Sequence, residues 1–382
     1  MKRKTLFLLL FICSLLFSCG KNRATVEANL EDEIKAQEPV IHTLTLVAAG
    51  DNLFHDTMIR PSPGGFNFTP YYAHIRSLIQ SADIAFVNQE TLLAGEEFGF
   101  SGYPRFNTPQ EAGIALIEAG FNVINQANNH TMDKGERAVF ATMDFWDKYP
   151  EITYLGVHRS QEMRDKPIVI EKNNIRVGFL SYTYGTNGIP VPRDKPYLVS
   201  LINTDIMAKE INALRPLCDF LIVSMHWGNE YQHNPSNQQR RLAAFLAEHN
   251  VDLVIGHHPH VLQPVEYFPR SNGGKMLCVF SLGNFISSQI PNYTLLGGLL
   301  YLKIQKDEDN NHISIKKAGI IPVVTHYEQG STNFRVYPLY DYNEELLARH
   351  RNKVRSELSL EYFHDLANVV LKDALINYNP FE

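Results

Sequence analysis

The sequence predicts an α/β protein, and two observations support this. From Thr43 onward, short apolar runs alternate with segments whose apolar residues recur at helical spacing, as in sheets covered by helices. The 382 residues, 44% hydrophobic and 20% charged, can bury a large core and have the composition of an ordinary globular protein. The net charge of −6 comes without a basic block, so we expect no nucleic-acid partner.

The N-terminal segment has the pattern of an export signal. Residues 1–4 are mostly basic, and residues 5–17 are almost wholly apolar. An apolar run of this length is shorter than the ~20 residues that a helix needs to cross a bilayer. We therefore expect a processed signal rather than a permanent transmembrane helix.

The run Leu16-Phe17-Ser18-Cys19 resembles the lipobox of bacterial lipoproteins. This resemblance implies a signal peptide over residues 1–18, cleavage before Cys19, and acyl chains on Cys19 that anchor the protein to a membrane of the cell envelope. A plain secretory signal with an incidental Cys19 is the alternative. Residues 19–41 are polar and acidic, and we expect them to form a tether between the lipid and the folded domain.

Strands and helices are expected in alternation after the tether. The predicted strands are residues 44–49, 84–87, 123–125, 168–170, 177–181, 220–224, 253–255, 276–281 and 299–304. The predicted helices are residues 109–118, 136–148, 205–214 and 236–249, each beginning near a Pro, Gly, Asp or Ser that can start a helix. Two further helices are expected from Tyr340 onward. Cys218 and Cys278 lie in predicted strands, where two buried thiols are a better interpretation than a disulfide.

Five predicted strands run directly into acidic, amide or imidazole side chains. Loops at the carboxyl ends of strands are where α/β folds place their sites. The candidates, strand by strand, are Asp51; Asn88 and Glu90; Asn128, Asn129, His130 and Asp133; His226 and Glu230; and His257, His258 and His260. Singly, each could be a turn residue, a helix cap, a solvated acid or a core histidine. Together they are the mixed oxygen and nitrogen ligands that bind zinc, manganese or iron, so they predict a divalent metal site.

The segment His258-Pro259-His260 strengthens this prediction. Alternation along an extended chain would place both histidine side chains on one side, where both could reach one metal pair. The sequence has no serine nucleophile elbow, no phosphate-binding Gly-Lys-Ser/Thr loop and no Cys–His pair that would indicate another chemistry.

The ordered motifs resemble the CapA, or poly-γ-glutamate capsule biosynthesis, family over about residues 44–325. They are Gly50-Asp51, Asn88-Gln89-Glu90, Asn128-Asn129-His130, His226-Trp227-Gly228, Gly256-His257-His258-Pro259-His260 and Ser281-Leu282-Gly283-Asn284-Phe285. The family is similar to calcineurin-like metallophosphatases, which implies a four-layer fold: a two-sheet β-sandwich flanked by helices, with a dinuclear site. We place this domain at residues 42–328, followed by a helical extension over residues 329–382.

The resemblance also implies roles for the matched residues. Asp51 would bind one metal ion, Glu90 would bridge both ions in place of the usual aspartate, and Asn129 and His226 would bind the second. His258 and His260 would complete the pair, and His130 would contact the substrate phosphate or protonate the leaving group. The supporting residues would be Asn88, Asn128, Asp133, Glu230, His257 and Asn284. The phosphatases have a histidine ligand two residues after the first aspartate, where this chain has Leu53, with His55 as a candidate substitute.

The expected function follows from the same resemblance. It implies an envelope lipoprotein that helps to make or export an anionic polymer such as poly-γ-glutamate, together with other polymer-synthesis proteins. Two divalent ions, of manganese, iron or zinc, would support hydrolysis of a phosphoester or related bond. The alternative is a non-catalytic binding or export subunit whose metal site is structural or degenerate.

Overall fold

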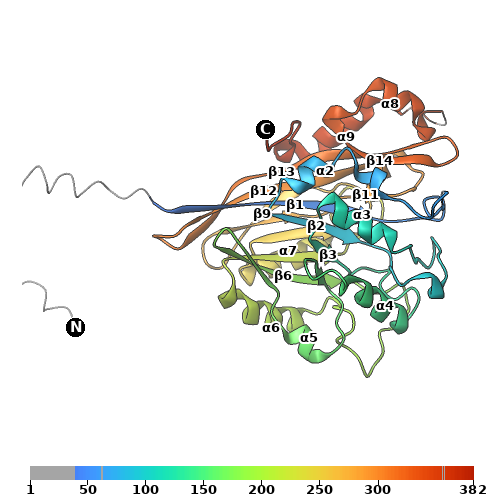
Figure 1. Ribbon diagram of the computed structural model, residues 1–382. Coiled ribbons are helices and arrows are strands. Elements are labelled where there is room, and N and C mark those ends of the chain that lie inside the picture. Colours follow the sequence, from blue (N-terminus) through green and yellow to red (C-terminus); the bar gives the residue numbers. More distant parts are fainter. Residues whose placement is uncertain (1–38, 62, 355, 357) are drawn as a thin grey trace, which may run out of the picture.

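Two mixed β-sheets pack against each other with helices on their outer sides, as the computed structural model of the protein shows (Figure 1). The structure describes residues 39–382 except 62, 355 and 357. The predicted signal peptide, Cys19 and nearly all of the predicted tether lie outside the described residues. Within the described part of the chain, no helix is long and apolar enough to cross a membrane. The predicted fold class, an α/β two-sheet sandwich with flanking helices, is confirmed.

The larger sheet has eight strands in the order β14-β13-β12-β1-β2-β3-β4, with β11 paired to the end of β1. These strands are β1 (Ile41–Asn52), β2 (Ile84–Gln89), β3 (Val123–Asn125), β4 (Thr153–Leu155), β11 (Asn284–Ile286), β12 (Leu296–Asp307), β13 (His312–Glu328) and β14 (Thr332–Pro338). Strands β1 to β4 run parallel, so their carboxyl ends meet at one edge, and β12 to β14 are antiparallel.

The second sheet has six strands in the order β5-β6-β7-β8-β10-β9. They are β5 (Val169–Lys172), β6 (Ile175–Thr183), β7 (Phe220–His226), β8 (Leu253–His257), β9 (Val265–Pro269) and β10 (Lys275–Val279). Side chains alternate between its faces: Ile222 packs toward the larger sheet, whereas Leu221 and Val223 pack in the cluster formed with the helices. This sheet therefore carries apolar residues on both faces, and Cys218 and Cys278 are free, buried thiols as predicted.

The helices form the outer layers. They are α2 (Arg76–Gln80), α3 (Glu111–Ala119), α4 (Glu136–Trp146), α5 (Gln161–Asp165), α6 (Thr204–Leu214), α7 (Asn237–Glu248), α8 (Glu344–Arg349) and α9 (Leu360–Leu371). Apolar residues of α6 and α7 pack on the second sheet, and those of α9 belong to the main core. Figure 1 shows α8 and α9 on one side of the sandwich and α5 and α6 on the other. The four helices predicted before residue 329 are confirmed.

The C-terminal segment differs from the helical extension that the sequence predicts. It starts with β14, which pairs antiparallel with β13 as the edge strand of the larger sheet. Phe334 and Val336 are buried at alternate positions, but this alternation covers too few residues to stand out in the sequence. The segment therefore completes the main sheet before it forms α8 and α9.

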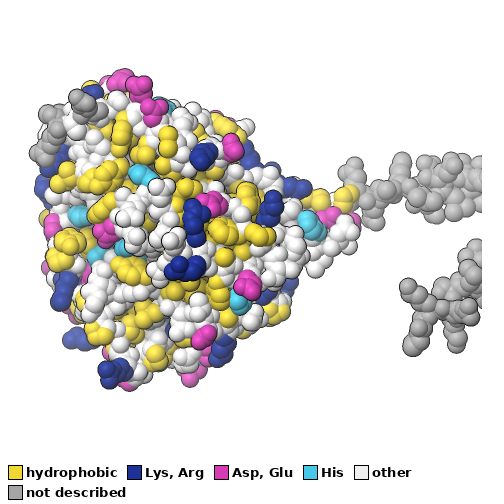
Figure 2. Space-filling view, turned by 180° about the vertical axis from the view of Figure 1, so that it is seen from behind, with side chains coloured by type: hydrophobic (Ala, Val, Ile, Leu, Met, Phe, Trp, Pro, Cys, Tyr) yellow, Lys and Arg dark blue, Asp and Glu magenta, His cyan; other side chains and the backbone are white. Residues whose placement is uncertain are grey.

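The surface is mixed in character on the face seen in Figure 2. Lys and Arg side chains lie there singly or in small groups between acidic and hydrophobic ones. No single contiguous basic patch covers this face of the described residues. This distribution matches the net charge of −6 and the low clustering of basic residues in the sequence.

Candidate metal centre

The carboxyl ends of strands from both sheets meet where the candidate residues gather. Two glycines allow the close approach of the backbones. A Cβ atom at Gly50 would lie 2.0 Å from the carbonyl oxygen of Gly283, and one at Gly256 would lie 2.0 Å from that of Phe280. Because no side chain fits at either position, glycine precedes both Asp51 and His257.

Asp51 is fully buried at the end of β1 and is surrounded by polar groups. Its Oδ2 lies 3.0 Å from Nδ1 of His260, and its Oδ1 accepts a hydrogen bond of 2.8 Å from Nδ2 of Asn88. Nδ1 of His257 is 3.5 Å from Oδ1, a contact without hydrogen-bond geometry. Burial works to raise the pKa of Asp51, but interactions with His257 and His260 outweigh it and hold the pKa well below its usual value. Asp51 is therefore a carboxylate.

Glu90 follows β2 and is also fully buried. Its Oε1 lies 3.6 Å from Nε2 of His226 and 3.8 Å from Nε2 of His260, but has no hydrogen-bond partner among the described residues. Burial and the nearby charge of Asp51 raise the pKa of Glu90 well above its usual value. An unpaired buried oxygen is costly, and a cation beside it would remove that cost. This atom fits the role of a metal ligand.

His226 and His258 lie on the other side of Glu90. Nε2 of His226 is 2.8 Å from Oδ1 of Asn129, and the His226 and His258 rings are 4.9 Å apart. Burial, followed by the neighbouring His258, lowers the pKa of His226 well below its usual value, and burial with His260 lowers the pKa of His258 to about 3. Both imidazoles are therefore neutral, the form that binds metals.

Three overlapping sets of side chains have ligand atoms within 4.8 Å of one another among the described residues. The first is Asp51, Glu90 and His260; the second is Glu90, His226 and His258; the third is Glu230, His258 and His260. Glu90 belongs to the first two sets, whose other members differ. This buried cluster of carboxylates and imidazoles could bind metal, and Glu90 is shared by two of the sets.

His130 is held by Asp133 beside this cluster. Its Nδ1 lies 2.8 Å from Oδ2 of Asp133, which also accepts a hydrogen bond of 2.7 Å from the backbone N–H of Phe106. The Phe106 ring packs edge-on against the His130 ring at 4.6 Å between centroids. With Nδ1 engaged, Nε2 is the nitrogen through which His130 can exchange a proton.

The supporting residues form a hydrogen-bond network around the ligands. Asn88 donates to Asp51 and, at 3.4 Å, to Oε2 of Glu90, and its Oδ1 accepts from Asn125 at 2.8 Å. Asn125 in turn accepts a hydrogen bond from Ser181 in the second sheet. Two further residues fix the loops: Asn128 donates to the Gln89 carbonyl at 3.0 Å, and Asn284, opposite Asp51 in the pairing of β1 with β11, donates to the Thr294 carbonyl at 3.0 Å.

The prediction that residues 258–260 are extended is wrong. His258 has φ of 97° and His260 has φ of 58°, so both lie in the left-handed region and the chain bends. Asp51 accounts for the bend, because its Oδ2 accepts from the His258 backbone N–H at 3.3 Å and contacts Nδ1 of His260. Such strain is characteristic of functional sites, and both rings reach the cluster.

The structure gives no ligand position to the residues near the missing phosphatase histidine. Leu53 is a buried core residue, and His55 packs against Phe106 with 5.5 Å between ring centroids. Among the described residues, neither belongs to the three ligand sets. The sets therefore lack the histidine ligand that, in the phosphatases, stands two residues after the first aspartate.

The loop after β6 contributes two residues that the sequence interpretation missed. Asn187 accepts a hydrogen bond of 3.2 Å from Asn129, and its Nδ2 lies 3.3 Å from Nδ1 of His130. Tyr184 lies over His258 with 4.6 Å between ring centroids. A usable signal exists, since β6 is a further strand that runs into polar and aromatic residues.

A two-sheet α/β protein with a buried carboxylate–histidine cluster at its strand ends is the class that this fold and site define. The chain belongs to the family described as bacterial capsule synthesis protein PGA_cap, whose model matches residues 45–289. The matched range contains every residue of the three ligand sets. The family resemblance predicted from the sequence is confirmed.

Two relatives are the capsule biosynthesis protein CapA of Bacillus anthracis and the PGA biosynthesis protein CapA of Bacillus subtilis. The first is 33% identical over 187 residues, covering 47% of this chain and 43% of the relative. The second is 31% identical over 184 residues, covering 48% of this chain and 47% of the relative. Each match therefore spans less than half of the relative. A phosphatase from Mycoplasma pneumoniae has a TM-score of 0.44 at 15% identity, covering 75% of this chain and 95% of that one.

Proposed function

We propose that this protein is a metal-dependent hydrolase that acts on a phosphoester or related bond during the synthesis or export of an anionic polymer. The observation that carries the proposal is the shared position of Glu90 between two ligand sets, with an oxygen that no described residue satisfies. The polymer, poly-γ-glutamate or a similar chain, is suggested by the capsule and PGA biosynthesis names of the relatives.

Six residues would hold the metal ions. Asp51 and His260 would bind one ion and His226, His258 and Asn129 the other, with Glu90 between them. Mixed carboxylate, amide and imidazole donors suit manganese, iron or zinc. When bound, such ions polarise a phosphoryl or carbonyl oxygen and make hydroxide available near neutral pH.

His130 would supply the proton for the leaving group. Asp133 holds Nδ1 at 2.8 Å and so fixes the ring, which directs Nε2 to proton transfer. Asn187 and Phe106 restrict the ring further. Positioned general acids of this kind typically contribute about 100-fold to 10,000-fold in rate.

Elemental analysis of the full-length protein tests this function. The protein is purified in detergent without chelator or added metal, together with Glu90→Gln and with Glu266→Gln, which alters a surface carboxylate paired with Arg240. We expect about two divalent ions per chain in the wild type and in Glu266→Gln, and a loss of metal in Glu90→Gln. Hydrolysis of 4-nitrophenyl phosphate with added manganese should fall in the same variant. If the wild-type protein contained no metal, the proposed metal-dependent hydrolysis would be refuted.

A non-catalytic surface subunit is the second candidate. It is favoured by Leu53, which occupies the position of a histidine ligand in the phosphatases and leaves the ligand sets incomplete by that comparison. Under this function the ions stabilise a surface that binds the polymer or partner proteins of its synthesis. Bound metal without turnover, combined with binding of poly-γ-glutamate, would favour this candidate over the enzyme.

The lipid anchor on Cys19 is part of the same proposal and places the protein in the cell envelope. The lipobox pattern supports it, and β1 starts at Ile41, the last residue of the proposed tether. Cys19→Ser should move the protein from the membrane fraction to the soluble fraction and reduce polymer display. Unchanged membrane association of this variant would count against the anchor.

A further inference from the structure

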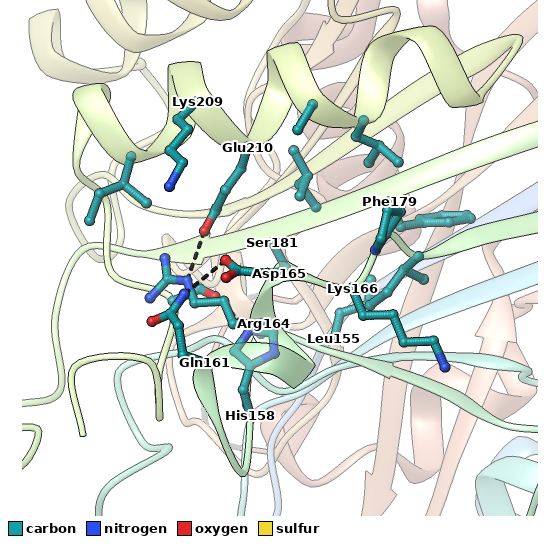
Figure 3. Close-up of a pocket in the computed structure, with 18 of the residues that line it drawn as sticks. Leu155, His158, Gln161, Arg164, Asp165, Lys166, Phe179, Ser181, Lys209 and Glu210 are labelled. Carbon is teal, nitrogen blue, oxygen red and sulfur yellow. Dashed lines mark hydrogen bonds and ion pairs between the residues drawn. The ribbon is translucent and has the colours of Figure 1, made fainter.

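A cavity of about 570 Å³ lies where β6 meets the end of β4, between α5 and α6 (Figure 3). No proposed metal ligand is among the described residues that line it. Its wall includes Ser181, whose hydroxyl donates to Asn125 of the network around the metal centre. The cavity is thus a neighbour of the metal centre, with a lining of its own.

One end of the cavity carries a buried cation with an unused donor. The Arg164 side chain is only 7% exposed; its Nε donates to Oε1 of Glu210 at 2.7 Å and its Nη1 to the Pro196 carbonyl at 3.2 Å. Its Nη2 has no hydrogen-bond partner in the described part of the chain. Leaving a buried donor unpaired costs free energy, so an acceptor beside this nitrogen would be stabilised.

Two polar neighbours of Arg164 are engaged with other partners. The second oxygen of Glu210, Oε2, accepts a hydrogen bond of 2.5 Å from the Tyr182 hydroxyl, so this carboxylate is engaged on both sides. The His158 ring lies 3.0 Å from the hydroxyl of Ser200 through Nε2. Burial, followed by the charge of Arg164, lowers the pKa of His158 to about 3, so it is neutral. Neither side chain satisfies Nη2 of Arg164, which has no hydrogen-bond partner among the described residues.

Charge and shape define that group. The lining includes three basic side chains (Arg164, Lys166, Lys209) and two acidic ones (Asp165, Glu210), which leave one net positive charge. Figure 3 shows Lys209 and Glu210 projecting from α6 toward Arg164, while Phe179 lies at the other end. Most of the remaining lining is apolar, with Leu155, Ile206 and Leu214 among its members. A cavity of this size suits a small molecule.

We infer that this cavity binds a small monocarboxylate with an apolar body. The carboxylate accepts a charge-assisted hydrogen bond from Nη2 of Arg164 close to Lys209, and the apolar part packs against Phe179. A single negative charge matches the net charge of the lining better than a phosphate dianion does. This inference is independent of the proposed hydrolase, because no metal ligand contributes to the cavity.

Binding of phenylacetate and of its neutral isostere phenylacetamide tests the inference. Both are titrated into the full-length protein in detergent and followed by ligand-observed NMR. We expect phenylacetate to bind at millimolar concentration and phenylacetamide to bind about tenfold more weakly, since the charge-assisted hydrogen bond is lost. Phenyl phosphate should also bind more weakly than phenylacetate. No binding of phenylacetate, or equal binding of the carboxylate and the amide, would overturn the inference.

Variants locate the probe. Because Arg164 is paired with Glu210 inside the protein, its replacement risks misfolding, so the variants are placed on exposed positions of α6. Ala213→Trp fills the cavity from a lining position and should abolish binding, and Lys209→Gln should weaken it several-fold. Asn212→Trp, at an adjacent exposed position that does not line the cavity, should bind like the wild type.

Carboxylates also bind metals, so a final variant distinguishes binding in the cavity from binding at the metal centre. Glu90→Gln should retain the affinity for phenylacetate even where metal and hydrolysis are lost. Loss of binding in Glu90→Gln with retention in Ala213→Trp would place the probe at the metal centre and overturn the inference.

Discussion

Two groups of buried histidines differ in whether their ring nitrogens have partners. Near the edge of the larger sheet, Nε2 of His350 lies 3.2 Å from the Thr325 carbonyl and its Nδ1 accepts from the Asn352 backbone N–H at 3.0 Å. Nδ1 of His326 lies 2.8 Å from the Tyr342 hydroxyl. At the metal centre, both nitrogens of His257 and Nδ1 of His258 lack hydrogen-bond partners among the described residues.

Burial is shared by both groups, and His258, His326 and His350 are all neutral, so neither property identifies a metal site. Burial, followed by the neighbouring His350, lowers the pKa of His326 to about 4, and burial lowers that of His350 to about 4. The one carboxylate near His326, that of Glu328, also lies 3.8 Å from Nε of Arg349. The centre instead combines unpaired nitrogens with two buried carboxylates that have no Lys or Arg partner among the described residues. Unsatisfied donors and acceptors that converge are therefore the informative feature.

The largest expected effect is from His260→Gln, compared with His350→Gln as the matched control. His260→Gln removes a nitrogen from the Asp51 set, so we expect loss of at least one ion per chain and a fall in turnover of more than about 1,000-fold, equivalent to several kcal/mol of transition-state stabilisation. His350→Gln should retain the metal but lower the free energy of unfolding by about 1–3 kcal/mol, because it disturbs a satisfied buried group. Elemental analysis and urea unfolding distinguish them. Equal metal loss in both variants would contradict the distinction between the metal-binding and the structural histidines.

A smaller effect is expected from His130→Gln, which lies beside the cluster without belonging to a ligand set. The metal content should stay at the wild-type level, while turnover of phenyl phosphate falls about 100-fold through loss of the general acid. The fall should be smaller with 4-nitrophenyl phosphate, whose leaving group needs little protonation. Unchanged turnover would show that His130 is not the general acid.

Expressed per histidine and per pH unit, the smallest effect concerns the satisfied pair, His326 and His350. The folded pKa values of His326 and His350, about 4, lie below the ordinary value of 6.5, so the unfolded chain binds more protons between these values. Stability is then complete above about pH 6.5 and falls as the pH drops toward 4, by about 1.4 kcal/mol per pH unit for each histidine. Urea unfolding of the chelator-treated wild type and His350→Gln at pH 7, 6 and 5 measures the contribution of the pair as the difference between the two slopes. A His350→Gln variant with an unchanged slope would contradict it.

Much of the fold could be predicted from the sequence, because its central strands are strongly apolar and its longer helices have clear spacing and caps. Five strands were not predicted: β4, β9, β11, β13 and β14. Edge strands such as Val265–Pro269 have half-exposed residues and acquire their structure from a partner strand. The first half of the inner strand β13 is also partly exposed, so its sequence lacks a continuous apolar run. Short elements such as α5 have too few residues for a period.

The candidate cluster could be located from the sequence because parallel strands bring their carboxyl ends to one edge. Its detailed geometry could not, because the left-handed conformations of His258 and His260 depend on Asp51, which lies some 200 residues away in the chain. The same limit applies to the unpaired Nη2 of Arg164. The bond from Tyr182 that engages Glu210, the neighbour of Arg164, cannot be predicted from the sequence.

The proposed ligands come from both sheets: Asp51, Glu90 and Asn129 lie at or just after the ends of strands of the larger one, and His226, His258 and His260 lie at or just after the ends of strands of the second. Ions bound between them would cross-link the two halves of the sandwich at this end. Ligand binding to the folded state alone stabilises it by an amount that grows with the logarithm of ligand concentration. The unfolding temperature of this protein should thus rise with the free metal concentration. Loss of metal should lower the stability of the sandwich as well as reduce the hydrolysis.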